Sequence, residues 1–119
     1  MKCISPRPIA PEEVAVLDAA LQRAAIAPVP AALLRATKAL KVVGVCDCGC
    51  RSLYFRLPSS GDFRIADATG LLADGTRVDV MVWAWGEEVA ALEIVDHVGQ
   101  GALPIAATVS SWEEARGAT

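Results

Sequence analysis

The stretch from residue 74 to residue 96 restricts the fold most, because it has the pattern of a β-hairpin bounded by turns. Residues 77–85 alternate between apolar Val or Ala and other side chains, which is typical of a strand that buries one face. Asp74-Gly75 before this strand indicates a tight turn, since both residue types tolerate the positive φ that primed turns require. Gly86-Glu87 indicates a second turn, after which residues 89–96 return as another strand. Such short connections predict antiparallel pairing.

The segments before this hairpin predict two helices and three further strands. Pro11-Glu12-Glu13 is typical of a helix start, and Val14, Leu17, Leu21 and Ala24 or Ala25 follow at helical spacing. A second helix is predicted from Ala31 to about Ala39, with Leu33, Leu34, Thr37 and Leu40 facing the core. Strands are predicted at residues 40–46, 52–57 and 63–72.

Together these elements predict an α+β fold. We expect residues 1–119 to form one domain, with two N-terminal helices packed on one face of an antiparallel meander of about five strands. Residues 1–10, which contain two prolines, are expected to be an extended lead-in. Residues 101–119 are ambiguous, although Ser110 with Glu113 and Ser111 with Glu114 fit capping boxes and predict a last helical turn near Trp112.

Charge and hydropathy argue against two classes of partner. The formal net charge is −3 and the chain has no run of Lys or Arg, whereas a nucleic-acid-binding protein needs a cationic surface. Apolar stretches are interrupted by Arg35, Lys38 and Lys41, well short of the roughly 20 residues of a membrane-spanning helix. The first residues lack the apolar core of a signal peptide, so we expect a cytoplasmic protein whose four cysteines are reduced or bind metal.

Three cysteines at alternate positions, Cys46, Cys48 and Cys50, are the chemically distinctive feature of the chain. On a straight strand their Cα atoms would be about 6.6 Å apart, from a rise of roughly 3.3 Å per residue. Zinc needs its ligand sulfurs about 3.7 Å apart, from tetrahedral Zn–S bonds of about 2.3 Å. The sulfurs converge only if residues 47–49 form a turn with Gly49 at positive φ. A fourth ligand would come from His97, Asp47, Cys3 or water.

Three interpretations of this cluster remain open. The simplest is that the cysteines are small buried apolar side chains at a bend. The second is a metal site, with zinc as the candidate, although zinc patterns usually contain two cysteine pairs and this chain has no second pair. The third is a labile disulfide, because a Cys-Gly-Cys bridge closes a small, strained ring that is easily reduced.

The second candidate site is an aromatic sheet face. Trp83 and Trp85 share one face of their strand with Met81, and Tyr54 of another predicted strand extends the same surface. A monomer rarely exposes so large an apolar surface. The surface predicts an interface with a second copy of the chain or with an unidentified protein, since Trp and Tyr are enriched in interfaces. Coverage by the C-terminal segment and a ligand pocket are the alternatives.

No catalytic constellation can be assigned from the sequence. The neighbours Asp96 and His97 would point to opposite faces of a strand, and a Cys–His pair would require the fold to bring His97 to Cys46 or Cys50. We therefore expect a protein that is not an enzyme and that needs no cofactor, unless the cysteine cluster binds zinc. The predicted function is a non-catalytic interaction module acting through the Trp face, and the alternative is a metal-binding or thiol-redox protein.

The chain resembles a loose group of small bacterial proteins of unknown function. The matching segments are Cys46-Asp47-Cys48-Gly49-Cys50-Arg51-Ser52, Asp74-Gly75-Thr76-Arg77-Val78 and Leu92-Glu93-Ile94-Val95. In size and α+β layout the chain also resembles immunity and accessory proteins of bacterial toxin systems. These resemblances imply the fold and a bacterial source, and they imply no catalytic residue.

Overall fold

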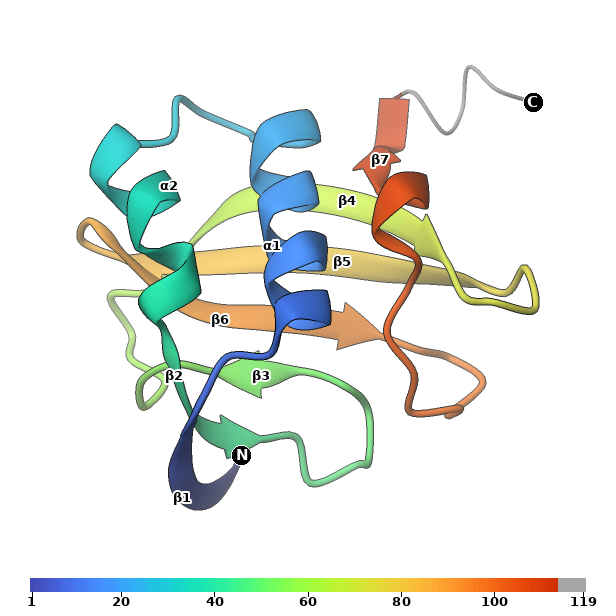
Figure 1. Cartoon of the computed structure of the whole chain (residues 1–119), viewed down its shortest axis with the longest axis horizontal. Helices are drawn as coiled ribbons and strands as arrows, with labels where there is room; N and C mark the ends of the chain where they lie inside the picture. Colours follow the sequence, from blue (N-terminus) through green and yellow to red (C-terminus); the bar gives the residue numbers. More distant parts are fainter. Residues whose placement is uncertain (114–119) are drawn as a thin grey trace.

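The computed structural model describes residues 1–113 and contains an antiparallel sheet with two helices, so the α+β prediction is confirmed (Figure 1). The helices are α1 (Pro11–Arg23) and α2 (Ala31–Ala36), with 3₁₀ turns η1 (Thr37–Ala39) and η2 (Ala106–Thr108). The strands are β1 (Lys2–Pro8), β2 (Lys41–Val45), β3 (Leu53–Tyr54), β4 (Phe63–Leu71), β5 (Arg77–Trp85), β6 (Glu88–Val95) and β7 (Ser110–Ser111).

The first helix begins as its sequence predicts. Pro11 occupies the first turn, where a missing N–H costs nothing, and the Glu13 side chain accepts a hydrogen bond from the Ala10 N–H at 2.8 Å. Val14, Leu17 and Leu21 are buried as expected. Ala24, rather than the exposed Ala25, completes the apolar stripe.

The second helix is shorter than predicted and ends in the 3₁₀ turn η1. Leu33 and Thr37 are buried and Leu40 packs against the core, but Leu34 is exposed, so its predicted core position is wrong. Neighbouring helical residues point about 100° apart, since a turn holds 3.6 residues, and so short a helix directs only one of the two leucines inward.

The prediction of a five-stranded meander is wrong in number and in order. Within residues 1–113 the sheet has seven strands in the order β1-β2-β3-β6-β5-β4-β7. The predicted neighbours β2 and β3, and likewise β4, β5 and β6, are paired, but β3 and β4 are not. Strand β3 pairs with β6 instead of β4. The segment of residues 55–62 between β3 and β4 contains Pro58 and is too long for a hairpin, so the chain leaves the sheet there and enters again at its other side.

This departure also shortens the strand predicted at residues 52–57, which contains only Leu53 and Tyr54. Leu53 is buried and Phe55 packs against the core, as the alternation predicts. Leu57, however, is 63% exposed, because the chain has already left the sheet.

The two additional strands lie at the sheet edges. Strand β1 lies within the predicted extended lead-in and pairs with β2, with a register irregularity between Cys3 and Arg7. An edge strand tolerates Pro6 because one side of its backbone needs no partner. Strand β7 pairs with β4, and helical residues begin at Trp112. Glu114, with the rest of the predicted C-terminal turn, lies outside the described residues.

The turn at Asp74-Gly75 is confirmed, but not as a primed turn with two positive φ values. Gly75 has φ +88°, while Asp74 has a negative φ. The Leu72 N–H donates to the Thr76 carbonyl at 2.8 Å, and Asp74 Oδ1 accepts the Thr76 N–H at 2.9 Å. The side chain of Asp74 therefore replaces a backbone acceptor in a longer loop.

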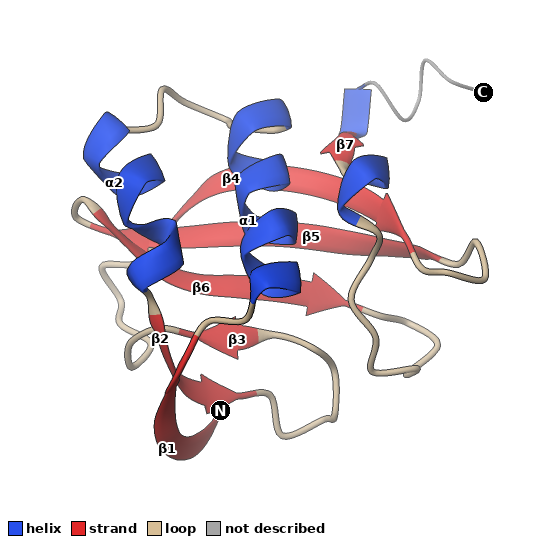
Figure 2. Ribbon diagram, in the orientation of Figure 1, coloured by secondary structure: helices blue, strands red, loops and turns tan. Residues whose placement is uncertain are grey.

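The core lies between α1 and one face of the sheet (Figure 2). Val78, Val80 and Val82 of β5 are fully buried in one cluster with the buried residues of α1. The C-terminal segment lies on this same side, where Arg23 donates to the carbonyl of Ala106 at 3.0 Å. As far as residue 113, this segment therefore does not cover the Trp face.

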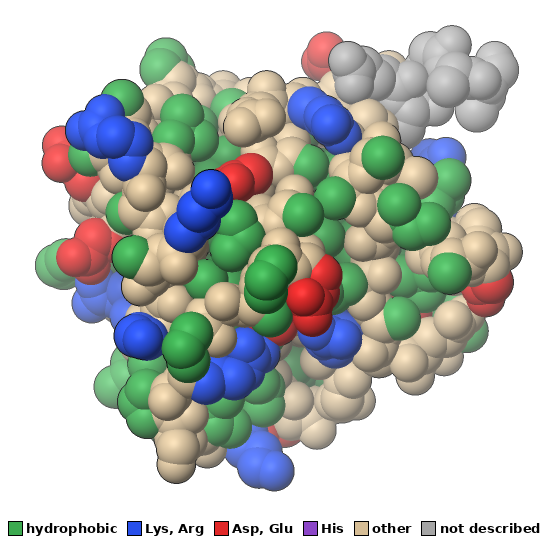
Figure 3. All heavy atoms as spheres, viewed as in Figure 1, with side chains coloured by type: hydrophobic (Ala, Val, Ile, Leu, Met, Phe, Trp, Pro, Cys, Tyr) green, Lys and Arg blue, Asp and Glu red, His purple; other side chains and the backbone are tan. Residues whose placement is uncertain are grey.

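Acidic and basic side chains are interspersed on the helix side of the molecule (Figure 3). Among the described residues, no helix is both long and apolar enough to cross a membrane.

Candidate metal centre

The three cysteines converge because residues 46–50 form a turn between β2 and β3. Gly49 has φ +87°, and its N–H donates to the Cys46 carbonyl at 3.5 Å. The sulfurs of Cys46, Cys48 and Cys50 all lie within 4.8 Å of one another. The straight-strand arrangement is therefore wrong, and the turn that sulfur convergence requires is present.

The cluster lies at the surface instead of in the core. Cys48 is exposed, Cys46 and Cys50 are half-buried, and all four cysteines of the chain are free thiols. Buried cysteines in a core would be shielded on all sides. The interpretation of the three as core side chains at a bend is therefore wrong.

Hydrogen bonds hold the thiols in position from both ends of the turn. The Cys48 N–H donates to Cys46 Sγ at 3.4 Å, and Cys50 Sγ donates to Ser52 Oγ at 3.2 Å. The Ser52 hydroxyl is itself buried, accepts the Ile94 N–H at 2.9 Å and lies 3.3 Å from the Ile94 carbonyl, to which it donates. Ser52 thus connects the cysteine turn to β6.

The thiols of Cys46 and Cys48 differ in acidity because they are hydrogen-bonded to each other. The hydrogen bond with Cys48 is the main cause that raises the pKa of Cys46 to about 11. The same bond lowers the pKa of Cys48, with a further contribution from the backbone N–H of Cys50. Cys48 is therefore the first of these two thiols to ionise, stabilised by the protonated Cys46. A thiolate, unlike a thiol, binds metals and attacks electrophiles.

None of the three predicted protein side chains supplies a fourth ligand to the cluster. Within residues 1–113, no further His, Cys, Asp or Glu joins the group of mutually close ligand atoms. His97 is 74% exposed and its Nε2 lies 3.7 Å from Asp79 Oδ2. Asp47 pairs with the N-terminal amine at 3.5 Å, and Cys3 lies on β1 opposite Gly44. A fourth ligand would have to come from solvent or from another molecule.

Two neighbouring segments support the turn. Arg51, which follows Cys50, reaches Glu13 of α1 at 3.4 Å, and Arg7 binds the same buried carboxylate through two hydrogen bonds of 2.9 and 2.8 Å. On the other side, Gly101 packs against the turn so closely that an added Cβ would lie 2.9 Å from the Gly49 carbonyl oxygen. Both contacts restrict how far the cysteine turn can open.

No protein-family model, curated protein or solved structure matches this chain.

The Trp face carries Trp83, Trp85, Met81 and Tyr54, as predicted, but most of these side chains already have partners. Trp83 Nε1 donates to Glu93 Oε1 at 3.0 Å, and the Arg56 guanidinium lies 3.8 Å from the ring centroid of Trp85. The Met81 sulfur accepts a hydrogen bond from Arg64 at 3.3 Å. Trp85 is nevertheless 42% exposed. The Trp face is therefore an amphipathic surface whose aromatic and Met side chains contact charged residues of the same chain.

Tyr54 links the Trp face to the cysteine cluster. Burial is the main cause that raises the pKa of Tyr54, and the charges of Cys46 and Glu93 raise it further, followed by those of Cys50 and Cys48. The phenol therefore lies within electrostatic reach of the three thiols. The two candidate sites treated separately in the sequence are neighbours in the fold.

Sequence reasoning missed the residues that support the thiols: Ser52, Gly101, Glu13 and Arg51. Arg51 and Ser52 carried a signal, because they close the segment Cys46-Asp47-Cys48-Gly49-Cys50-Arg51-Ser52. Glu13 and Gly101 contact this region from α1 and from the loop after β6, which no local pattern indicates.

Proposed function

We propose that this protein binds a thiophilic metal ion, in the first place zinc, reversibly through Cys46, Cys48 and Cys50. The observation that carries this proposal is the convergence of the three sulfurs within 4.8 Å on a surface turn. Tetrahedral zinc–thiolate geometry places sulfurs about 3.7 Å apart, so a closure of about 1 Å between sulfurs completes the site. Rotation of exposed cysteine side chains supplies such a movement without a change in the sheet.

Three thiolates around an open fourth position define what the site can do. Thiolate ligands favour soft and borderline ions such as Cu⁺ and Zn²⁺ over Mg²⁺ or Ca²⁺. Because Cys46 holds its proton in the free protein, metal binding must release that proton, and affinity must rise with pH. The fourth position is available to water or to a ligand from another molecule.

The position of the site favours loading and release of the ion over a structural role. Small zinc domains fold only with metal, because the ion replaces a core. Here the core cluster runs from α1 through β5 and does not include the cysteines. Cys48 is exposed, so an incoming ligand can reach the ion directly. These features support transient metal binding in a protein that is folded without it.

A zinc titration of the reduced protein against a chromophoric chelator tests this proposal. We expect one zinc per chain, with loss of binding when Cys46, Cys48 and Cys50 are all changed to Ser. The matched control is Cys3→Ser, which removes an exposed cysteine outside the cluster and is expected to leave the affinity unchanged. Equal zinc binding by the triple variant and the wild type would contradict the proposal. Saturation of the cysteine site by Mg²⁺ would also contradict it.

A second candidate function is self-association through the Trp face, supported by the exposure of Trp85 at the sheet surface. Its partner would be a second copy of this chain. Light scattering coupled to size exclusion measures the mass directly. We expect a dimer that Trp85→Ser converts into a monomer, and a wild-type monomer would exclude this candidate.

A further inference from the structure

Three paired residues on the outer face of the sheet place an aromatic side chain on either side of an alanine, and we call the space above this alanine the slot. Ala91 of β6 pairs with Tyr54 of β3 on one side and with Trp83 of β5 on the other. Neighbouring strands lie about 4.8 Å apart, so the Cα atoms of the two aromatic residues are about 10 Å apart, with only a methyl group between them. The small Ala91 side chain leaves space beside both aromatic residues for one flat group.

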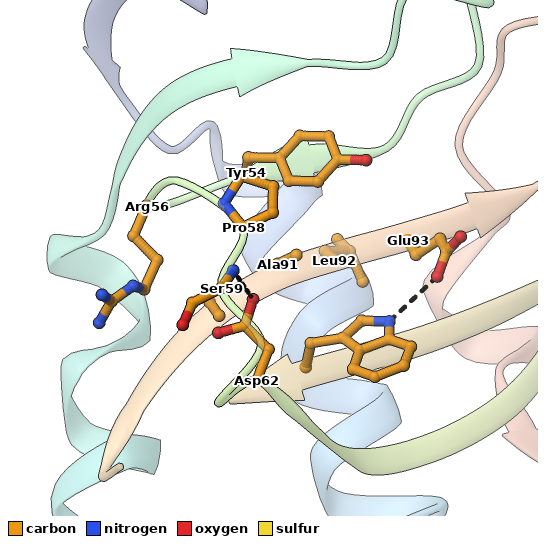
Figure 4. A pocket seen from close by; sticks show the side chains of 10 residues that line it. Tyr54, Arg56, Pro58, Ser59, Asp62, Ala91, Leu92 and Glu93 are labelled. Carbon is orange, nitrogen blue, oxygen red and sulfur yellow. Dashed lines mark hydrogen bonds between the residues drawn. The ribbon is translucent and has the colours of Figure 1, made fainter. Parts of the chain in front are cut away.

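The slot is part of a cavity of about 270 Å³ (Figure 4). Figure 4 shows Glu93 toward the hydroxyl end of Tyr54, with Ser59 and Asp62 toward the opposite end and Ala91 between. The cavity is closed on that side by the segment of residues 55–62 that leaves the sheet after β3. The volume suits one small ring rather than a large ligand.

Both carboxylates of this cavity have one oxygen left for a ligand. Glu93 Oε1 accepts the Trp83 indole N–H at 3.0 Å, and within residues 1–113 Glu93 Oε2 accepts no hydrogen bond. Asp62 Oδ2 accepts the Ser59 N–H at 2.9 Å, whereas Asp62 Oδ1 is buried and has no hydrogen-bond partner within residues 1–113. A buried acceptor without a donor costs stability, so a donor from outside the chain would be favoured there.

Arg56 also lines the cavity, but its guanidinium is directed away from Glu93 (Figure 4). This guanidinium stacks on Trp85 and approaches Glu88 at 3.7 Å. Its Nε, like Asp62 Oδ1, is buried without a partner among the described residues. Arg64 lies 4.0 Å from Asp67 and 5.9 Å from the Trp83 ring centroid. The charge offered to a ligand between the rings is therefore that of Glu93 and Asp62.

We propose that this slot binds the flat cation of a small molecule, an amidinium or guanidinium group. It packs against Tyr54 and Trp83, since cations are attracted to aromatic faces. Its in-plane N–H groups donate to Glu93, because planar N–H pairs match carboxylates. The slot uses no cysteine, so this inference stands apart from the proposed metal site.

Benzamidine and benzamide test the proposal as a matched pair, because they have nearly the same size and shape and differ in charge. Isothermal titration is carried out on the wild type and on the variant with all three clustered cysteines changed to Ser. We expect benzamidine to bind both proteins at least about tenfold more tightly than benzamide. Equal affinity for the two probes, or no binding of benzamidine, would overturn the proposal whatever the metal experiment shows.

Two variants locate the binding. Glu93→Gln keeps an acceptor for Trp83 but removes the charge, and it should abolish the preference for benzamidine. Ala91→Leu fills the slot and should abolish binding of both probes, with circular dichroism as the check on folding. Glu87→Gln, an exposed carboxylate at the turn before β6, is the matched control and should leave both affinities unchanged. An unchanged preference in a folded Glu93→Gln protein would also overturn the proposal.

Discussion

Cys50 Sγ donates a hydrogen bond to Ser52 Oγ over 3.2 Å, and this contact fixes one thiol of the cluster to the sheet. The hydroxyl belongs to a buried side chain that is also bonded to the backbone of Ile94 in the neighbouring strand β6. The position of Cys50 is therefore set by β6 as well as by its own turn. Groups that orient metal ligands in this way affect affinity without touching the metal.

Ser52→Ala should weaken zinc binding about 10–100-fold, the usual effect of removing a group that orients a ligand. It should also lower the free energy of unfolding by roughly 1–3 kcal/mol, because the buried Ile94 N–H loses its acceptor. Chelator competition and urea unfolding measure the two effects. Ser59→Ala, in an exposed turn, is the control and should leave zinc affinity unchanged. An unchanged zinc affinity in Ser52→Ala would exclude a positioning role for Ser52.

Gly49→Ala tests whether the turn conformation brings the sulfurs together. An alanine at φ +87° costs roughly 1–2 kcal/mol, although its Cβ would meet no atom within 4 Å. This strain favours other turn conformations in which the sulfurs separate, so zinc affinity should fall about tenfold, which corresponds to about 1.4 kcal/mol.

Gly75→Ala provides the matched control, because Gly75 has φ +88° and equally open surroundings in a different turn. Both variants should lose similar stability in urea unfolding, while only Gly49→Ala should lose zinc affinity. Equal zinc affinities in the two variants would show that the turn conformation does not matter for binding.

The buried Glu13 should make stability depend on pH in the acidic range. Burial alone would raise the pKa of Glu13, but hydrogen bonds from Arg7 and from the Ala10 N–H lower it on balance. The folded pKa then lies below the unfolded value of about 4.3, so ionised Glu13 stabilises the fold above that pH. This stabilisation is lost as pH falls through the folded pKa.

Urea unfolding between about pH 6 and pH 3 measures this effect. Glu13→Gln should be less stable than the wild type at pH 6 by roughly 1–3 kcal/mol, since bonds to a charged group are lost. The difference should shrink toward pH 3. Glu12→Gln, an exposed carboxylate in the same helical turn, is the control. A constant difference across the range would rule out a role for the ionisation of Glu13.

Alkylation should distinguish the thiols of the cluster. Cys48 is exposed and has a lowered pKa, whereas the pKa of Cys46 is raised to about 11. Iodoacetamide at neutral pH should therefore modify Cys48 before Cys46, as read by peptide mass spectrometry. Zinc should protect both cysteines and leave Cys3 reactive. Faster modification of Cys46, or equal protection of Cys3, would contradict this assignment.

The sequence predicted the parts of the fold that depend on local patterns. The period of 3.6 in α1 and the period of two in β5 were each correct, because a single buried face determines both. The pairing of β3 with β6 was missed, because it depends on where residues 55–62 leave the sheet. The strand β1 was missed because its prolines argue against a strand, and only an edge position tolerates them.

The candidate site was predictable in composition but not in geometry. Alternate spacing identified the three cysteines, and Gly49 identified the turn that would make them converge. Whether that turn forms depends on Gly101 and Ser52, which act through contacts with a distant loop and strand. The proximity of Tyr54 to the thiols likewise follows from tertiary structure.

X-ray absorption spectroscopy of the zinc-loaded, reduced protein counts the sulfur atoms bound to the metal. We expect three sulfur neighbours at about 2.3 Å and one lighter ligand, nitrogen or oxygen, at about 2.0–2.1 Å. In Cys48→Ser the sulfur count should fall to two or the metal should be lost. A shell made only of nitrogen and oxygen, or a sulfur count unchanged in Cys48→Ser, would contradict the assignment of Cys46, Cys48 and Cys50 as the ligands.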